Sequence, residues 1–308
     1  MPRQAAIAVG CGIVAALFYL SVLTGSPGAL ILVYLAQFPL FLAGLSMGAQ
    51  AGAIAAGAGG VVVLLLAGML STLFFLAVDA LPATLLVQRA LLWRSDEDGR
   101  IWHYPAGRLA MWLAGLGVAA VAATALWFAD WPGGLPGAAQ ELVAASLGRS
   151  FELGEEAQQR IAGWFPGFAA LSWLLMVALN GVLAQGVLAR FGGNKRPSPD
   201  IAELELLRWA PAALAAAILA AVAAPGMLGY LGANFWPALA LPFVFAGLAV
   251  VHALTRRFAA RAPILMAFYV VLFVFGWPIP LVAALGFLEQ WLGLRRRFAL
   301  PAAGRGGE

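Results

Sequence analysis

Charged residues and cysteine are scarce in this chain of 308 residues, and both shortages exclude classes of protein. Only 10% of the residues are charged and 63% are hydrophobic, whereas a soluble domain carries about a quarter charged residues. A single cysteine, Cys11, excludes a disulfide framework and a cysteine-based metal site. Two histidines, His103 and His252, are too few for a histidine metal site. The mean hydropathy of +0.91 points instead to a membrane protein.

Motifs of catalysis and nucleotide binding are also missing. The chain has no P-loop, no nucleophile elbow, no HExxH and no GxGxxG after a strand. We therefore expect no enzymatic activity, no catalytic residue, no metal and no cofactor. One alternative stays open, an intramembrane enzyme acting on a lipid, with Glu289 and either His252 or His103 as acid and base. Nucleic-acid binding is not expected, because the basic residues flank apolar segments instead of forming one patch.

Long apolar stretches separate the charged segments, and their lengths suit the roughly 20 residues that cross a bilayer core. This pattern predicts an all-α, polytopic transmembrane helix bundle, since a β-barrel would show short alternating segments. We place eight spans, at residues 5–24, 28–47, 51–70, 72–92, 108–129, 167–190, 209–227 and 235–254. A last apolar stretch, 263–294, contains two prolines in GWPIP. Because prolines break helices, we predict a C-terminal helical hairpin there, which gives about ten helices.

The distribution of basic residues predicts the orientation. If both termini are cytoplasmic, sixteen of the eighteen basic residues lie on the cytoplasmic side, as the positive-inside rule requires. The other two fall in the loop 130–166, which we therefore place outside. Helical spacing of apolar residues there predicts amphipathic helices on the membrane surface or capping the bundle; these residues are Leu142, Leu147, Leu153 and Ile161. We expect residues 1–298 to form a single transmembrane domain and 299–308 a disordered cytoplasmic tail.

Asp79 is the most unusual residue, because it lies inside the apolar run FFLAVDALPA. A carboxylate in the hydrocarbon core costs about 2.5–3.5 kcal/mol unless it is paired or hydrated. Pro82 loosens the backbone nearby, and freed backbone beside a carboxylate suits a polar cavity. A protonated Asp79 bonded to a neighbouring helix is the structural alternative. Three amides are further candidates for ligand binding, although such amides also bond helices together; they are Gln37, Asn180 and Gln185.

Small residues recur at every fourth position in GLSMGAQAGAIAAGAGG. They are Gly44, Gly48, Gly52, Ala56 and Gly60. A face of small residues lets helices approach closely. We therefore expect tight packing where the second and third spans meet, either inside the bundle or against a membrane-protein partner.

Two groups of residues are expected at the membrane–water interface, where tryptophan and tyrosine are enriched. Asn234, Phe235 and Trp236 form the first group, at the outer end of the eighth span. Trp93 and Trp102 form the second, in the cytoplasmic loop WRSDEDGRIWHYPAGR, which we expect to be a solvated turn.

Three stretches carry a resemblance to a known family: PLFLAGLSMGAQAGAIAAGAGG at Pro39–Gly60, LPATLLVQR at Leu81–Arg89, and PLVAALGFLEQWLGLRRR at Pro280–Arg297. They are similar to the YybS-like predicted membrane proteins, also called the DUF2232 family. Members have a P…LG…G start, an LP helix end, and an end like Gly-Leu-Leu-Asp-x-Trp-Phe followed by arginines. Here Glu289 stands where an Asp is common. The resemblance implies a multi-pass membrane protein and no particular activity.

A weaker similarity is to the substrate-binding S components of energy-coupling-factor transporters. Those proteins dock onto a transmembrane partner through a small-residue helix face, which Gly44–Gly60 resembles. The sequence thus favours a multi-pass protein of the bacterial inner membrane that binds or transports a small solute. The alternative is a membrane scaffold or assembly factor that binds another protein. The first hypothesis predicts that Asp79 faces a bundle cavity with a second polar group in reach; the second predicts no internal cavity.

Overall fold

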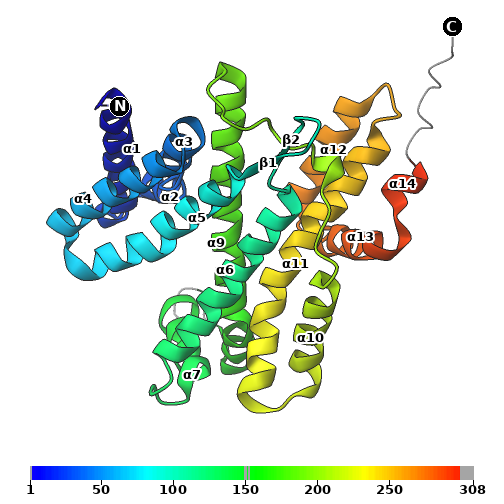
Figure 1. Ribbon diagram of the computed structural model, residues 1–308. Helices are drawn as coiled ribbons and strands as arrows, with labels where there is room; N and C mark the ends of the chain where they lie inside the picture. Colours follow the sequence, from blue (N-terminus) through cyan, green and yellow to red (C-terminus); the bar gives the residue numbers. More distant parts are fainter. Residues whose placement is uncertain (1, 149–150, 152, 299–308) are drawn as a thin grey trace, which may run out of the picture. The chain divides into compact units, whose positions relative to one another are not determined.

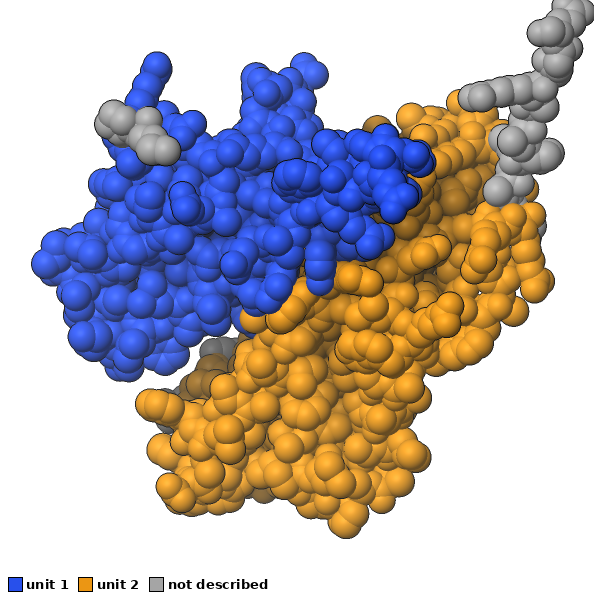
Figure 2. All heavy atoms as spheres, in the orientation of Figure 1, with its two compact units in different colours: residues 1–105, 172–198 blue, residues 106–171, 199–308 orange. Residues whose placement is uncertain are grey.

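The computed structural model describes residues 2–148, 151 and 153–298 (Figure 1). Apart from connecting segments and one two-stranded hairpin, the described residues are helical. They divide into two compact units (Figure 2), with residues 1–105 and 172–198 in unit 1 and residues 106–171 and 199–308 in unit 2. The predicted single domain stays a prediction, and the predicted disordered tail lies outside the described residues.

Six helical stretches of the described chain are long and apolar enough to cross a membrane: Arg3–Thr24, Pro27–Met47, Ala49–Ala90, Ala106–Trp127, Glu155–Phe191 and Gly226–Thr255. Three shorter apolar helices accompany them. The all-α class and the multi-pass character are thereby confirmed. The number of eight spans and the cytoplasmic placement of both termini stay predictions.

Unit 1 begins with helix α1 (Pro2–Leu20) and the short turn η1 (Ser21–Thr24), followed by α2 (Pro27–Tyr34) and α3 (Phe38–Met47). The predicted span 28–47 is therefore two helices with a break between them. Pro39 lies at the start of α3, where the missing N–H of a proline is tolerated.

The next helical stretch reverses its direction at Gly68. It comprises α4 (Ala49–Phe75), the π-helical turn η2 (Leu76–Ala80) and α5 (Leu81–Ala90). Gly68 has φ 79° and ψ −179°, which is not helical. A Cβ on Gly59 would lie 2.9 Å from the Phe75 ring, whereas sixteen residues of straight helix span about 24 Å. The predicted segments 51–70 and 72–92 are thus the two antiparallel arms of this hairpin.

A β-hairpin follows α5, formed by β1 (Trp93–Ser95) and β2 (Ile101–His103). Its turn is organised by Asp96, whose carboxylate accepts hydrogen bonds from the indole Nε1 of Trp102 at 2.9 Å and the backbone N–H of Arg100 at 2.8 Å. These bonds lower the pKa of Asp96. Trp93 and Trp102 are exposed. We had expected a turn here without strands.

Helix α9 (Glu155–Phe191) contributes its first part to unit 2 and its second part to unit 1. Unit 2 also contains α6 (Ala106–Trp127), α7 (Gly134–Val143) and the π-helical turn η3 (Ala144–Gly148). Because α9 starts at Glu155, its first residues fall within the predicted loop 130–166, for which we expected helices; the extracytoplasmic placement of this loop stays a prediction.

The apolar face of α7 differs from the predicted one. Leu135, Ala139 and Val143 are buried, and the last two pack with Ala162 of α9. Leu142, which we placed on the apolar face, lies on another side of the helix and is 52% exposed, as it also would be in a helix lying on the membrane surface, so its role stays a prediction. The buried residues are spaced four apart, which puts them on one side of the helix and turns Leu142 away.

The C-terminal half of unit 2 begins with the 3-10 turn η4 (Ile201–Glu203). It continues with α10 (Ala210–Ala223), α11 (Gly226–Thr255), α12 (Arg261–Phe275), α13 (Ile279–Leu292) and α14 (Leu294–Phe298). The predicted hairpin at 263–294 corresponds to α12 and α13, with a break at residues 276–278. Gly276, at φ 65°, and Pro278 end one helix and start the next.

Helix α11 packs against α13 through glycines. A Cβ on Gly247 would lie 1.9 Å from the carbonyl oxygen of Val282, and one on Gly286 would lie 1.9 Å from that of Phe243. Neither distance leaves room for a side chain, so the two backbones touch. The small residues that we singled out in the sequence do not include this pair, although it makes one of the tightest helix contacts in unit 2.

Candidate functional site

The centre of the candidate site is the break between α4 and α5. In a regular helix the carbonyl of Val78 accepts a bond from the N–H of residue 82, but Pro82 has none. Two side chains replace the missing N–H: Gln37 Nε2 and Trp173 Nε1 each donate to Val78 O at 2.9 Å. Pro82 therefore frees a carbonyl, as the sequence suggested, and other helices of unit 1 satisfy it.

Asp79 lies next to this carbonyl and is only 3% exposed. The side-chain amide of Gln37 lies within reach of the carboxyl as a hydrogen-bond donor. Gln37 is thus a second polar group beside Asp79, while the bundle cavity that the solute hypothesis also requires stays a prediction. Described residues pack around the carboxyl, and it does not face the outside of unit 1.

Asn180 closes the break between α2 and α3. Its Nδ2 donates to Tyr34 O at 2.7 Å and to Met176 O, in its own helix, at 2.8 Å. Tyr34 is the last residue of α2, so its carbonyl belongs to a helix end that needs an external donor. The fully buried amide therefore joins α9 to α2.

Two buried oxygens near these breaks lack a donor. Within the part of the chain that the structure describes, Gln37 Oε1 and Asn180 Oδ1 have no hydrogen-bond partner. Leaving a buried acceptor unsatisfied costs about 1–3 kcal/mol. Of the two, Gln37 Oε1 belongs to the side chain that lies beside Asp79. A proton on Asp79, a water molecule or a cationic ligand would supply what is missing.

Gln185 does not join this group. It is partly buried, and its Nε2 donates to Arg196 O at 2.9 Å and to Ser198 Oγ at 3.3 Å. Arg196 in turn donates to Ala90 O, eleven residues from Asp79 and so about 16 Å away along α5. Gln185 fixes the segment after α9.

The small residues of the predicted packing face divide between two helices. Gly48, with φ +115°, is the corner between α3 and α4, so no single helix face contains all five. A Cβ on Gly44 would lie 2.6 Å from Val87, and one on Gly60 would lie 3.2 Å from Leu76. A Cβ on Gly52 would lie 3.3 Å from Gly44 Cα, and Ala56 is buried. These contacts lie inside unit 1.

Asn234 forms a second polar centre, in unit 2, that we did not predict. Its Oδ1 accepts the N–H of Gly167 at 2.8 Å, and its Nδ2 donates to Gly163 O at 3.0 Å. Asn234 is fully buried, so its placement in an interface belt was wrong. The signal in the sequence is Pro166, because a proline inside a helix leaves backbone groups that need partners.

Glu289 and Arg295 form a largely buried ion pair, with Nε 2.9 Å from Oε1. The same guanidinium donates to Ala202 O at 2.9 Å, which ties α14 to η4. Of the residues named for the alternative enzyme, Glu289 pairs with this arginine, His252 bonds the Tyr269 hydroxyl at 2.8 Å, and His103 lies in β2. That alternative stays a hypothesis. Among the described residues, no cluster of three or more His, Cys, Asp or Glu could hold a metal.

A second ion pair, between Asp200 and Arg256, lies near the first. Asp200 also accepts the N–H of Ala202 at 2.9 Å, which caps η4. The hydrogen bond from Arg256 lowers the pKa of Asp200. The two pairs connect the ends of α11 and α13 through the segment at η4.

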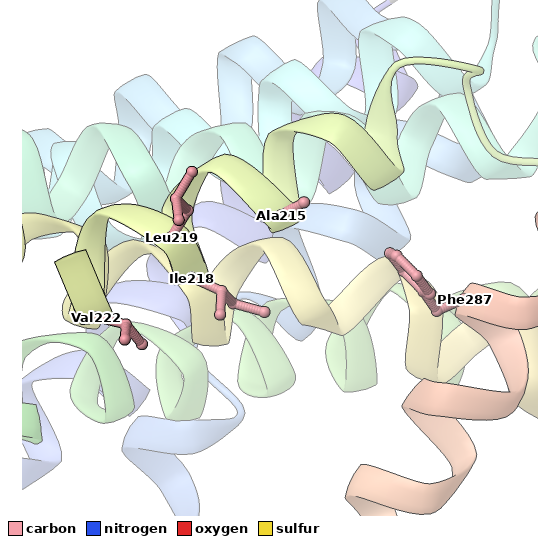
Figure 3. Close-up of a pocket in the computed structure, with 5 residues that line it drawn as sticks. All are labelled: Ala215, Ile218, Leu219, Val222 and Phe287. Carbon is pink, nitrogen blue, oxygen red and sulfur yellow. The ribbon is translucent and has the colours of Figure 1, made fainter.

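A surface hollow of about 390 Å³ lies between α10 and α13 (Figure 3). Only apolar side chains line it, namely Ala215, Ile218, Leu219, Val222 and Phe287. It offers no group for acid–base chemistry or for recognition of a polar solute, so it is not part of the candidate site.

Fold and site together define a multi-pass helical membrane protein whose buried polar side chains gather at helix breaks. Residues 143–289 match the family described as "Predicted membrane protein (DUF2232)". The resemblance is confirmed there. The quoted stretches at Pro39–Gly60 and Leu81–Arg89 lie outside the matched residues. Comparisons with curated proteins and with solved structures found no match.

Proposed function

We propose that this protein binds a small cationic solute at Asp79 and serves as a binding or transport component of the bacterial inner membrane. Gln37 would provide a neutral oxygen beside the carboxylate. The observation that supports this proposal is a buried acid beside the Gln37 side chain, whose amide oxygen has no donor among the described residues. Among the described residues, no Lys, Arg or His forms an ion pair with Asp79, so a positive charge from a solute would remove the cost of the buried anion.

The role would be like that of the S components of energy-coupling-factor transporters, which deliver a bound solute to a membrane partner. We propose that the protein itself is not an enzyme. Asn180 would take part less directly, because its Nδ2 is used by Tyr34 O while its Oδ1 is free to accept.

A neutral Asp79 that donates to Gln37 Oε1 is the structural alternative, and Asp79→Asn distinguishes the two. Asparagine has nearly the same shape and can donate a hydrogen bond, but it carries no charge. If Asp79 only bonds helices together, the variant keeps the stability and behaviour of the wild type. If Asp79 binds a cation, the variant loses binding while it stays folded.

The test uses the full-length protein in lipid nanodiscs. Thermal unfolding is followed while Na⁺, K⁺ or an alkylammonium ion is added, and solutes that copurify are identified by mass spectrometry. A ligand at 100 times its Kd stabilises the protein by about 2.7 kcal/mol. Asp79→Asn should abolish this stabilisation, and Asp96→Asn, in the exposed hairpin, should retain it. The proposal is contradicted if a cation stabilises Asp79→Asn as much as Asp96→Asn. It is also contradicted if no cation stabilises the wild type and no solute copurifies with it.

The second candidate function is a membrane scaffold or assembly factor. It is favoured by α12, an apolar helix none of whose residues is buried in the described structure. A partner helix could cover it, although lipid would do so equally well. Site-specific photocrosslinking from Phe273, which is 93% exposed, should then yield one defined protein adduct; lipid adducts alone would count against this function.

A further inference from the structure

The start of α4 gathers groups that attract an anion. The first N–H groups of a helix have no partner inside it, and no side chain caps this helix. Its first turn contains no acidic residue. The partial positive charge of a helix N-terminus favours anions, phosphate in particular. The N–H groups of Ala49, Gln50 and Ala51 are the ones available.

A lysine lies beside this helix end. The backbone N–H of Lys195 donates to Leu45 O at 3.3 Å, and its Nζ donates to Met47 O at 2.8 Å. The ammonium group would be 3.4 Å from a Cβ on Gly48, the residue that precedes α4. Lys195 is exposed, so one side of its ammonium group is open to a ligand.

A buried arginine comes next in the chain. Arg196 is only 6% exposed; it donates to Ala90 O at 3.0 Å, and its Nε has no hydrogen-bond partner in the described part of the chain. The end of α5 lies alongside the start of α4, because a Cβ on Gly52 would be 4.0 Å from Val87. Its bond to Ala90 O therefore holds the guanidinium at the end of α5, which lies beside the first turn of α4.

The position of this arginine is fixed by two amides. Gln185 Nε2 and Asn194 Nδ2 donate to Arg196 O at 2.9 and 2.7 Å. Neither Lys195 nor Arg196 forms an ion pair among the described residues. Each side chain donates to one carbonyl at a helix end, Lys195 to Met47 O in α3 and Arg196 to Ala90 O in α5. The positive charges are therefore not neutralised, and donors such as Arg196 Nε still lack an acceptor.

We propose that the start of α4, Lys195 and Arg196 form a binding site for a phosphate group, presented by the headgroup of an acidic phospholipid. This site is independent of the proposed solute site at Asp79. Its basic residues lie on the side that the positive-inside rule assigns to the cytoplasm, where acidic lipid headgroups attract basic residues and occupy basic pockets between helices. A soluble phosphate compound offers the same chemistry, and the experiment separates the two sources.

The experiment measures lipid retention by native mass spectrometry of the full-length protein. Three preparations are compared: with phosphatidylglycerol, with phosphatidylcholine, and with inorganic phosphate alone. The wild type should retain phosphatidylglycerol preferentially. Lys195→Gln should weaken retention about fivefold, since a basic residue near an acidic surface contributes about that much. Ala49→Pro removes one N–H at a helix position that accepts proline, and it should weaken retention as well without unfolding the protein.

Arg94→Gln is the matched control, because it removes one positive charge from the exposed strand β1 on the same predicted side of the membrane. It should retain the lipid as the wild type does. Equal weakening by Arg94→Gln, or unchanged retention in both Lys195→Gln and Ala49→Pro, overturns the proposal. Binding of inorganic phosphate with no preference for phosphatidylglycerol would support the phosphate site but overturn its assignment to a lipid.

Discussion

The Asn234 bridge in unit 2 allows a quantitative test of how this protein maintains a helix break. Asn234 joins the N–H of Gly167 to the carbonyl of Gly163, the two groups that bond to each other in a regular helix. Asn234→Leu keeps the approximate size but removes both bonds, together with a third bond to Tyr230 O. Two of these bonds join α11 to α9, and their loss leaves the Gly167 N–H and the Gly163 carbonyl without their partner. A buried polar group left unpaired costs about 1–3 kcal/mol, so we expect about 2 kcal/mol of destabilisation.

A second substitution should rescue the first. Pro166→Ala restores an N–H and removes the ring that clashes with the preceding turn, so Gly167 and Gly163 can bond to each other directly. In that background Asn234→Leu should cost less than about 1 kcal/mol, which gives a coupling energy of about 1 kcal/mol or more. Reversible unfolding in mixed micelles, followed by tryptophan fluorescence and circular dichroism, measures all four proteins of the cycle.

Tyr230 makes a further contact to the same break in α9. Tyr230 donates its hydroxyl to Ala162 O at 3.1 Å, the carbonyl that Pro166 leaves without a donor. Tyr230→Phe should therefore destabilise by about 0.5–1.5 kcal/mol. If Asn234→Leu unfolds like the wild type, or if the two substitutions in the cycle are additive, the bridge does not maintain the break.

Three further outcomes are expected. Gly286→Val should prevent the contact between α11 and α13 and abolish monodisperse purification, because its Cβ would lie 1.9 Å from a carbonyl oxygen; Gly115→Ala, with open space around it, should purify normally. Glu289→Gln should lower the unfolding free energy by about 3 kcal/mol, because it leaves the paired guanidinium largely buried without its anion; an unchanged urea midpoint would contradict this. In a cysteine-free background, Glu97→Cys should react with an impermeant maleimide only after cell lysis and Glu141→Cys in intact cells; the reverse result would invert the predicted topology.

The apolar stretches alone predicted much of the helical framework. Hydrocarbon thickness sets the length of a span, so the hairpin arms at 51–70 and 72–92 and the two C-terminal helices could be located to within a few residues. The reversal at Gly68 fell where two apolar runs met, and only a glycine adopts its φ of 79° easily. The β-hairpin could not be predicted in the same way, since three-residue strands leave too little alternation to recognise.

The polar centres were harder to predict, because each is made by residues far apart in the sequence. Trp173 reaches a carbonyl 95 positions away, and Gly167 donates to a side chain 67 positions away. No local periodicity encodes such a pairing. What the sequence does contain are the prolines at these breaks. Because a proline has no N–H to donate, Pro82 leaves Val78 O without its usual helical donor, and Pro166 does the same to Ala162 O.

Asp79 differs from the side chains that satisfy the freed carbonyl beside it, because an ionised carboxylate cannot donate a hydrogen bond. The carbonyl oxygen that Pro82 leaves without its helical N–H cannot be satisfied by lipid, so it needs a hydrogen-bond donor. The repairing groups here are the amide and indole N–H groups of Gln37 and Trp173, with a tyrosine hydroxyl and an asparagine amide in unit 2. An ionised carboxylate only accepts. Asp79 therefore cannot repair the break beside it while it is charged, and its position is explained either by a bound proton or by a bound cation, the two states that Asp79→Asn separates.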